Sequence, residues 1–320
     1  MDGRDDVALT NLDQPLFDDA RATKRDLVDY LEAVSEQLLG ELRGRPLSVV
    51  RALRGQKPFM QKNVPKYAPP WLKTVTIWAE RSKRDVAYAL CNDRRTLLWF
   101  ANQRAIEYHP TLARADSHGL VQTQTHLVLD LDPPAEAGFD AVARVAQLVR
   151  RALADAGLAG AVKTSGAKGL HVFVPVAQPA SGEEIAAATR ALAARAEHID
   201  SQLATTAYVL EERGGKVFLD ATRAGGATVV AAYSPRIRPD TPVSYPVLWD
   251  ELDRVTPTDF TIHTVPTLLR GGNPWADRLP EPQSLPPDLI DEGRAIPIAR
   301  VQAMHEGKRR ARAQRGRADS

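Results

Sequence analysis

The chain has few of the features that define several large classes of protein. Its 320 residues include one cysteine, Cys91, which excludes an internal disulfide framework and a zinc site built from cysteines. No run of about 18 apolar residues occurs, so we expect no helix that spans a membrane. Residues 1–6 are mostly charged and lack the apolar core of a secretory signal. We therefore expect a cytoplasmic protein with no membrane partner.

Net charge is also small, at +2, but basic residues gather at the C-terminus. Residues 308–312 include Lys308 and three arginines, and Arg315 and Arg317 follow. We expect residues 301–320 to form a flexible basic tail, which either binds polyanions or only improves solubility. The rest of the chain, which is 43% hydrophobic overall, is long enough for one large domain or two smaller ones.

Hydrophobic periodicity predicts helices and strands that interleave without a regular βαβ repeat. Three amphipathic helices and a short acidic one are expected, at residues 23–42, 139–156, 183–205 and 247–254. Strands are expected at residues 47–53, 74–78, 86–90, 97–100, 126–132, 161–164, 170–174, 217–220 and 228–233. This mixture favours an α+β fold with mixed and antiparallel sheets flanked by helices.

Two aspartates, Asp130 and Asp132, end the strand expected at residues 126–132, which a proline pair stops. Because side chains alternate along a strand, both carboxylates point to one face, with Cα atoms roughly 6.6–6.8 Å apart. Carboxylates at this spacing can hold a pair of divalent cations, the usual machinery of nucleotidyl transfer. An isolated pair of this kind more often just ends a strand. Asp220, which ends a later strand, offers the third carboxylate that a two-metal site needs.

A glycine-containing loop at residues 164–171 joins two expected strands. Its backbone N–H groups can cradle phosphate, and Ser165, Lys168 and His171 add a hydroxyl, a positive charge and an imidazole. The loop lacks the Walker A spacing, and by itself it is more typical of a hairpin turn. Downstream, Arg236 offers a planar fork for triphosphate oxygens, unless it is an ordinary surface arginine.

Two further segments carry groups that suit nucleotides or nucleic acid. His109 can donate to a phosphate or a base, although a lone histidine beside a proline is more often a structural turn residue. Residues 57–71 place Phe59 and Lys62 among other basic and aromatic residues, and such mixtures bind phosphates and unstacked bases. A solvated loop with anchoring aromatic side chains is the alternative interpretation.

The ordered set of these segments resembles one family. It is similar to the archaeo-eukaryotic primase-polymerase superfamily, in the branch typified by the polymerase domain of bacterial ligase D, which serves non-homologous end joining. The resemblance runs from about residue 9 to about residue 300 and is carried by residues 11–13, 59–63, 107–110, 130–133, 164–171, 218–220 and 233–236. It implies a primase-polymerase domain over residues 1–300, with an N-terminal helical, DNA-contacting part of about 1–110 and a catalytic part of about 111–300.

The resemblance also implies roles for individual residues. Asp130, Asp132 and Asp220 would be the catalytic residues and would bind two ions of Mn²⁺ or Mg²⁺. The incoming nucleoside triphosphate would be held by His109, Ser165, Lys168, His171 and Arg236. DNA would be contacted by Lys24, Phe59 and Lys62.

The implied activity is that of a DNA-repair primase-polymerase that adds nucleotides to primer 3′ ends at short gaps or breaks, with NTPs preferred over dNTPs. Its partners would be gapped or broken DNA with template and primer, NTPs or dNTPs, and a separate DNA ligase, with other end-joining or excision-repair proteins. Such a protein would be cytoplasmic and associated with the nucleoid. The chain carries no adenylating K-x-D-G motif, so we expect a stand-alone relative without a fused ligase.

Several positions depart from the family pattern. Gln14 stands where relatives often have a lysine for the 5′-phosphate across the gap, although Lys24 matches the second phosphate-binding position. Ala167 replaces a loop glycine, and residues 221–225 differ from the usual sequence. Two other functions stay open: a catalytically silent DNA-end-binding module that recruits a ligase, and a metal-dependent phosphoesterase that uses the same acids.

Overall fold

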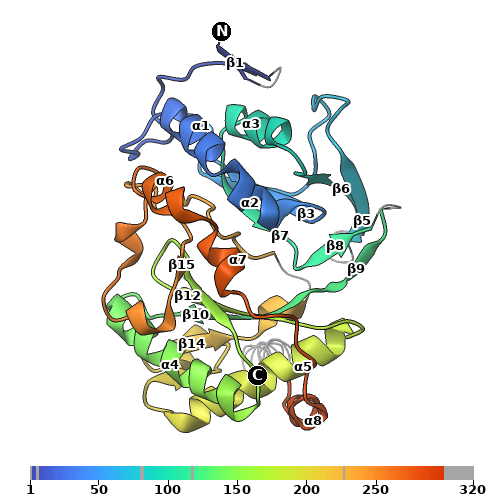
Figure 1. The fold of residues 1–320 in the computed structure, drawn as a ribbon, viewed down its shortest axis with the longest axis vertical. Helices are drawn as coiled ribbons and strands as arrows, with labels where there is room; N and C mark the ends of the chain where they lie inside the picture. The colour runs from blue at the N-terminus through green and yellow to red at the C-terminus, as the bar shows by residue number, and fades with distance from the viewer. Residues whose placement is uncertain (1, 5–6, 80–82, 117–118, 226–227, 299–320) are drawn as a thin grey trace, which may run out of the picture.

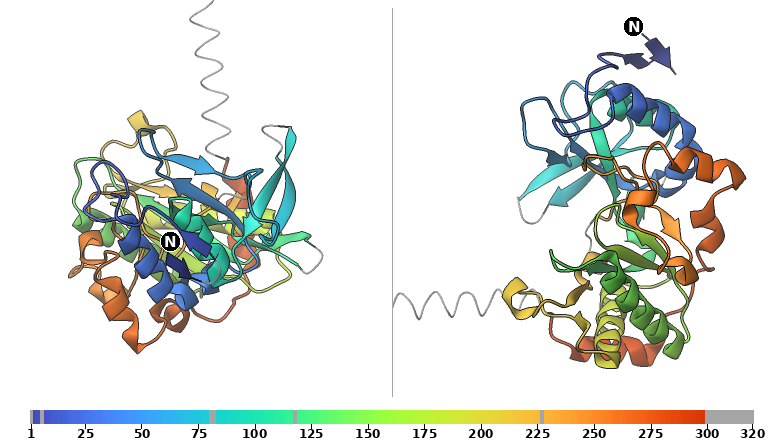
Figure 2. Two further views of the ribbon diagram at one scale, coloured as in Figure 1. Left: turned by 90° about the horizontal axis from the view of Figure 1, so that it is seen from above. Right: turned by 90° about the vertical axis from the view of Figure 1, so that its left-hand side faces the viewer.

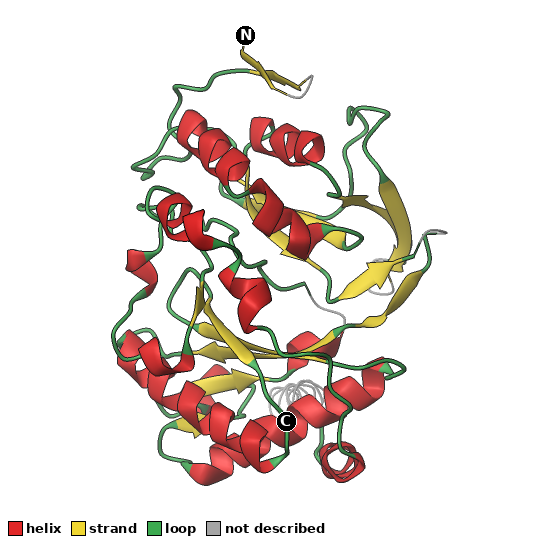
Figure 3. Cartoon of the chain, viewed as in Figure 1, coloured by secondary structure: helices red, strands yellow, loops and turns green. Residues whose placement is uncertain are grey.

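Two β-sheets, each with its own covering helices, are stacked along the long axis of the molecule (Figure 1). The computed structural model describes residues 2–4, 7–79, 83–116, 119–225 and 228–298. One continuous cluster of buried apolar side chains runs through both sheets and their helices. The arrangement confirms the predicted α+β class with mixed sheets and flanking helices (Figure 3). Within the described ranges, no helix combines the length and apolar character that crossing a membrane requires.

The first sheet is antiparallel and lies in the N-terminal part of the chain. Its strands follow the order β4 (Phe59–Gln61), β3 (Pro46–Arg51), β6 (Arg84–Leu90) and β5 (Thr74–Ala79), and β3 also pairs with β7 (Ala105–Pro110). Three helices accompany it: α1 (Lys24–Ala33), α2 (Ser35–Leu42) and α3 (Arg94–Asn102). Two small hairpins are formed by β1 (Asp2–Arg4) with β2 (Val7–Leu9), and by β8 (Ala113–Ala115) with β9 (Val121–Gln124).

The second sheet carries the three aspartates. Its strand order is β13 (Ala204–Thr205), β14 (Val217–Asp220), β10 (His126–Asp132), β12 (Leu170–Pro175), β11 (Ala161–Thr164) and β15 (Pro246–Val247). All pairings are antiparallel except the parallel pairing of β13 with β14. The helices below it in Figure 1 are α4 (Phe139–Asp155) and α5 (Gly182–Ile199), with α8 (Pro287–Ala295) packed against α5. These helices cover one face of the sheet, and its other face is turned toward the N-terminal part of the molecule (Figure 2).

The segment that follows β14 returns to the first sheet and ties the two parts together. The N–H of Val229 donates to the Pro110 carbonyl at 3.2 Å, and the N–H of Ala231 donates to the Tyr108 carbonyl at 2.9 Å. The buried hydroxyl of Tyr30 donates to the Tyr233 carbonyl at 2.7 Å.

The short helices are η1 (Leu210–Glu212), η2 (Thr222–Gly225), η3 (Trp249–Glu251), η4 (Pro257–Asp259), α6 (Val265–Leu268), η5 (Leu269–Gly271) and α7 (Pro274–Arg278).

The strand predicted at residues 97–100 is wrong, because this segment lies inside helix α3. The Asp93 carboxylate accepts from the N–H of Thr96 at 2.8 Å and so caps the helix. The side chains of Leu97, Leu98 and Phe100 are all buried. A short apolar run that is buried on every side has no amphipathic period, so its length and composition also fit a strand.

Other predicted boundaries shift. The helix predicted at 23–42 is two helices that meet at Val34, although the Thr23–Asp26 capping box is confirmed. The helix predicted at 183–205 ends at Ile199, and residues 204–205 form strand β13 instead. The segment at 228–233 makes backbone hydrogen bonds to β7 without forming a strand, and the acidic helix at 247–254 shrinks to η3. The basic tail at 301–320 lies outside the described residues, and the division at about residue 110 stays a prediction.

Candidate metal centre and phosphate loop

Strand pairing brings the three predicted aspartates together. The antiparallel register of β10 and β14 places Asp130 directly opposite Asp220. Alternation along β10 turns Asp132 to the same face as Asp130. One carboxylate oxygen from each residue lies within 4.8 Å of the others. Residues 90 positions apart in the chain thus form one cluster of hard oxygen ligands, which is the donor chemistry that Mn²⁺ and Mg²⁺ prefer.

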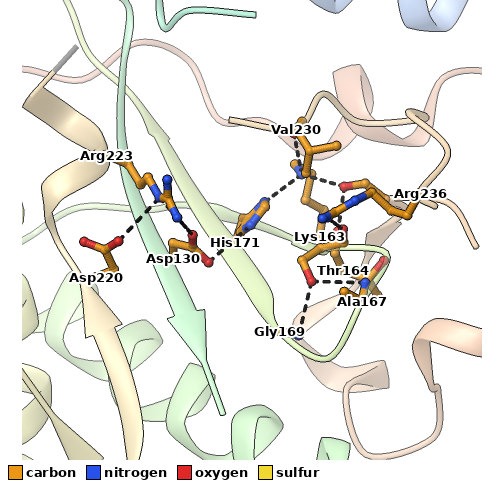
Figure 4. Close-up of polar contacts among 12 residues, drawn as sticks. Asp130, Lys163, Thr164, Ala167, Gly169, His171, Asp220, Arg223, Val230 and Arg236 are labelled. Atoms are coloured by element: carbon orange, nitrogen blue, oxygen red, sulfur yellow. Dashed lines mark hydrogen bonds and ion pairs between the residues drawn. The ribbon is translucent and has the colours of Figure 1, made fainter. Parts of the chain in front are cut away.

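An arginine that the sequence analysis missed lies within this cluster (Figure 4). Arg223, on η2, places Nε and Nη2 each 3.0 Å from Oδ2 of Asp130. The same Nε lies 3.4 Å from Oδ2 of Asp220. The only local signal in the sequence is the i,i+3 spacing between Asp220 and Arg223, which surface pairs share.

The pKa values of the two aspartates of β10 are shifted in opposite directions. Burial would raise the pKa of Asp130, but the charges and hydrogen bonds of His171 and Arg223 outweigh burial and hold it below the usual range. The pKa of Asp132 is raised, first by burial and then by the negative charge of Asp130. The cluster therefore carries more negative charge than its surroundings neutralise, so the three residues fit a site for divalent cations.

Behind Asp130, a histidine and a lysine form a buried chain of polar contacts. His171 lies opposite Asp130 in the β10–β12 register, and its Nε2 is 3.3 Å from Asp130 Oδ1. Its Nδ1 lies 2.9 Å from the Nζ of Lys163, a residue of β11 whose exposed fraction is 0%. The Lys163 ammonium also donates to the Val230 carbonyl at 2.9 Å and to the Ser244 hydroxyl at 2.6 Å. An ammonium has no lone pair, so Nδ1 accepts and the ring proton sits on Nε2.

Lys163 was not predicted to be part of the site. A lone lysine in an otherwise apolar strand is the signal that could have found it, because lysine is almost never fully buried without partners. Burial, followed by the charge of Arg236, lowers the pKa of Lys163 to about 7. Burial and then the charge of Lys163 lower the pKa of His171 to about 4.

The glycine-containing loop is a tight turn between β11 and β12. The Ser165 hydroxyl oxygen accepts from the N–H groups of Ala167 at 3.2 Å and Gly169 at 3.1 Å. Gly166 has φ +68°, and a Cβ on Gly169 would lie 2.4 Å from the Leu131 carbonyl oxygen. The loop thus packs against the end of β10, beside the aspartates. Lys168 is exposed and its ammonium donates to the Ala135 carbonyl.

Arg236 and His109 meet at a shared carboxylate, Glu107, for which the sequence analysis had no role. The Nε of Arg236 lies 3.1 Å from Glu107 Oε1, and the Nε2 of His109 lies 2.9 Å from Glu107 Oε2. Arg236 also donates to the Ser165 carbonyl, so the pair of Glu107 and Arg236 links the first sheet to the loop. Burial would raise the pKa of Glu107, but the His109 hydrogen bond and the Arg236 charge lower it to about 2.

The three residues predicted to contact DNA differ in exposure. Phe59 is 37% exposed on β4, and the adjacent Lys62 is also exposed. Lys24 is only 2% exposed, and its ammonium donates to the Thr10 carbonyl at 2.7 Å and to Asn102 Oδ1 at 2.6 Å. Burial and the charge of Arg104 lower the pKa of Lys24 to about 8. In this conformation Lys24 joins the N-terminal segment to α3, and its role at DNA stays a prediction.

A cavity of about 590 Å³ lies beside the first sheet, and Gln14 is part of its wall. Arg54, Arg104 and Arg238 line it together with two aspartates. The Arg104 guanidinium lies 3.5 Å from Gln14 Oε1 and also donates to the Pro15 and Leu16 carbonyls. The position at which the chain departs from the family lysine therefore contacts one arginine and lies in a cavity lined by three arginines and two aspartates.

The described geometry agrees with comparisons to known proteins. The model of the family described as "LigD, primase-polymerase domain" matches residues 23–275 of this chain. The chain belongs to the LigD primase-polymerase domain family. The resemblance inferred from the ordered motifs is thereby confirmed.

Curated relatives are longer than this chain. The chain is similar to the multifunctional non-homologous end joining protein LigD of Mycobacterium bovis, with 36% identity over 77% of this chain and 33% of the relative. It is also similar to the bifunctional non-homologous end joining protein LigD of Bacillus subtilis, with 31% identity over 89% of this chain and 46% of the relative. The chain thus spans between a third and a half of the length of these two relatives.

A solved structure shows the same fold. The polymerase domain of Mycobacterium tuberculosis ligase D, determined in complex with DNA, superposes with a TM-score of 0.77 and 35% identity. The match covers 85% of this chain and 97% of that domain.

Proposed function

We propose that this chain is a DNA-repair polymerase that adds nucleotides to primer 3′ ends at short gaps or breaks, with NTPs preferred over dNTPs. The observation that carries the proposal is the carboxylate triad of Asp130, Asp132 and Asp220, on the face of a sheet that also holds Lys163, His171 and the Ser165–Gly169 loop. Membership of the LigD primase-polymerase domain family supports the same activity.

In the proposed mechanism, the triad would hold two ions of Mn²⁺ or Mg²⁺. Bound there, divalent ions supply Lewis-acid chemistry: activation of a hydroxyl nucleophile and stabilisation of charge on the leaving pyrophosphate. The chain's own residues prepare the carboxylates. His171 donates Nε2–H toward Asp130 Oδ1, and Thr222 donates to Asp220 Oδ1, so both side chains are oriented before an ion arrives.

The triphosphate would be bound by cationic groups beside the triad. Lys168 is exposed at the tip of the loop, and Arg236 is held at the base of the loop by Glu107 and the Ser165 carbonyl. His109 shares the Glu107 carboxylate with Arg236. Because Glu107 fixes the positions of these two side chains, the site is preorganised for an anion. The Ser165 hydroxyl stabilises the loop, because its oxygen accepts from the N–H groups of Ala167 and Gly169.

DNA would lie along the exposed edge that carries Phe59 and Lys62, because aromatic and cationic groups there are open to solvent. The Arg-lined cavity at Gln14 would accept the downstream strand of a gap, where it offers guanidinium groups in place of the family lysine. A separate ligase would seal the product, in the cytoplasm at the nucleoid.

The test is extension of a labelled primer on gapped DNA with Mn²⁺ and either NTPs or dNTPs, with and without a downstream 5′-phosphate. We expect incorporation by the wild-type protein and a loss of about a thousandfold or more in Asp130→Asn and Asp220→Asn, because each removes a charged ligand. DNA binding without incorporation would instead support the silent end-binding module. Release of phosphate or mononucleotides without synthesis would support the phosphoesterase.

A further inference from the structure

The Arg223 guanidinium occupies a specific pair of oxygen atoms in the carboxylate triad. His171 contacts Oδ1 of Asp130, and the N–H and hydroxyl of Thr222 donate to Oδ1 of Asp220 at 2.8 and 2.6 Å. Both Oδ2 atoms face Arg223, at 3.0 Å for Asp130 and 3.4 Å for Asp220. Each buried carboxylate thus has one oxygen held by its own neighbouring donor and the other oxygen held by Arg223.

The electrostatics explain why a cation is needed there. The side chains of Asp130 and Asp220 are only 9% and 10% exposed, so water screens their repulsion weakly. Arg223 contributes one positive charge against three carboxylates, and its own side chain is 37% exposed. A divalent ion that binds these Oδ2 atoms at about 2.0–2.6 Å would lie close to the guanidinium, and the two positive charges would repel each other.

We infer that Arg223 is a built-in counter-cation for the metal-free triad, and that its guanidinium moves away when divalent ions bind. This inference rests on the proposed two-metal function. Replacement of the Arg223 guanidinium by divalent ions sets the concentration of divalent ion that the protein requires. Arg223 is a positioning residue in this role, because it acts through the carboxylates of Asp130 and Asp220.

The surroundings of Arg223 allow it to leave without disturbing the sheet. Arg223 belongs to the short helix η2, which follows β14 directly, and its partly exposed side chain can rotate toward solvent. The contacts from His171 and Thr222 keep the two carboxylates oriented after the guanidinium has gone. The pairing of Asp130 with Asp220 through the backbone is independent of the side chain of Arg223.

The test measures binding of Mn²⁺ alone, without DNA or nucleotide, by the electron paramagnetic resonance signal of free Mn²⁺. Wild-type protein is compared with Arg223→Gln, and with Arg294→Gln as a control that removes the same charge from α8, where Arg294 pairs with Asp291 at 3.2 Å. We expect Arg223→Gln to bind Mn²⁺ about three- to tenfold more tightly than wild type at low ionic strength, and Arg294→Gln to match wild type.

A thermal unfolding series on the same proteins gives a second readout. In EDTA, Arg223→Gln should unfold at a lower temperature than wild type, because its triad lacks a counter-charge, and Mn²⁺ should raise its unfolding temperature by more than that of wild type. Equal or weaker Mn²⁺ affinity in Arg223→Gln overturns the inference and leaves the proposed function standing. No binding of Mn²⁺ to any of the proteins at millimolar concentrations overturns both.

Discussion

The ammonium of Lys163 and the carboxylate of Asp130 contact the two different nitrogen atoms of the His171 ring. Lys163 Nζ is 2.9 Å from Nδ1, and Asp130 Oδ1 is 3.3 Å from Nε2. Lys163 is fully buried and His171 nearly so. The contact from Lys163 selects the ring tautomer that presents a donor to Asp130, so a residue that never reaches solvent orients a residue of the triad.

Lys163 makes the stability of the protein depend on pH in the alkaline range. Its pKa is lowered from 10.5 to about 7 in the folded protein, so folding favours loss of the ammonium proton at alkaline pH. A depressed folded pKa gives stability that is present above pH 10.5 and is lost as pH falls toward 7. We expect the free energy of unfolding of wild type, relative to Lys163→Met, to increase from pH 7 to pH 10, by at most about 1.4 kcal/mol per pH unit.

Urea unfolding at several pH values measures this difference. Lys168→Met is the matched control, because it removes an exposed lysine from the loop that follows β11. Its difference from wild type should stay constant over the same pH range. A difference for Lys163→Met that is also constant would contradict the prediction.

Glu107 should produce a dependence of the same sign at acid pH, with stability again lost as pH falls. Its pKa is lowered from 4.5 to about 2, despite burial, by the His109 hydrogen bond and the Arg236 charge. The stability it contributes is complete above pH 4.5 and disappears as pH falls through 2. We expect Glu107→Gln to lower the free energy of unfolding at pH 7 by on the order of 3 kcal/mol, and by less at pH 3.

Chemical unfolding at pH 7, 5 and 3 checks this expectation. Glu136→Gln, at an exposed carboxylate, serves as control and should change stability little at any of these pH values. A Glu107→Gln deficit that does not shrink at pH 3 would rule out the ionised carboxylate as its source.

Two glycines should respond in opposite ways to the same substitution. A Cβ on Gly169 would lie 2.4 Å from the Leu131 carbonyl oxygen, next to the aspartates of β10. We expect Gly169→Ala to lower the free energy of unfolding by about 1–3 kcal/mol, because backbone must shift. Gly182, the first residue of α5, has no atom within 4 Å of the added Cβ, so Gly182→Ala should stabilise by up to about 1 kcal/mol. Urea unfolding of both variants measures the contrast, and equal effects would contradict it.

Divalent ions should stabilise the folded protein through the triad. At about a hundred times its dissociation constant, a ligand that binds only the folded state adds about 2.7 kcal/mol. We therefore expect Mn²⁺ to raise the unfolding temperature of wild type by several degrees, and EDTA to reverse the rise. Asp220→Asn should lose this response, whereas Asp291→Asn, at an exposed carboxylate of α8, should keep it. A full response in Asp220→Asn would place the bound ion elsewhere.

Local signals in the sequence were sufficient for the strands that carry the site. The proline stop after Asp132, the short Leu/Val-rich run before it and the Thr23–Asp26 capping box each act over a few residues, and the structure has the strand, its end and the cap. They placed Asp130 and Asp132 on one face of a strand. The same kind of signal failed at residues 97–100, where an apolar run buried on all sides carries no period to separate helix from strand.

What the tertiary structure alone decided is which distant groups meet. The register of β10 against β14 and β12 sets Asp220 and His171 beside Asp130, and registers between strands this far apart in the chain leave no local pattern. Burial of Lys163, the approach of Arg223 to the triad and the sharing of Glu107 by Arg236 and His109 follow from the same packing. The sequence determined that this chain carries the carboxylates and cations of the candidate site. Packing decided which cation faces which carboxylate, because charge interactions at 3 Å depend on positions that only the assembled sheets define.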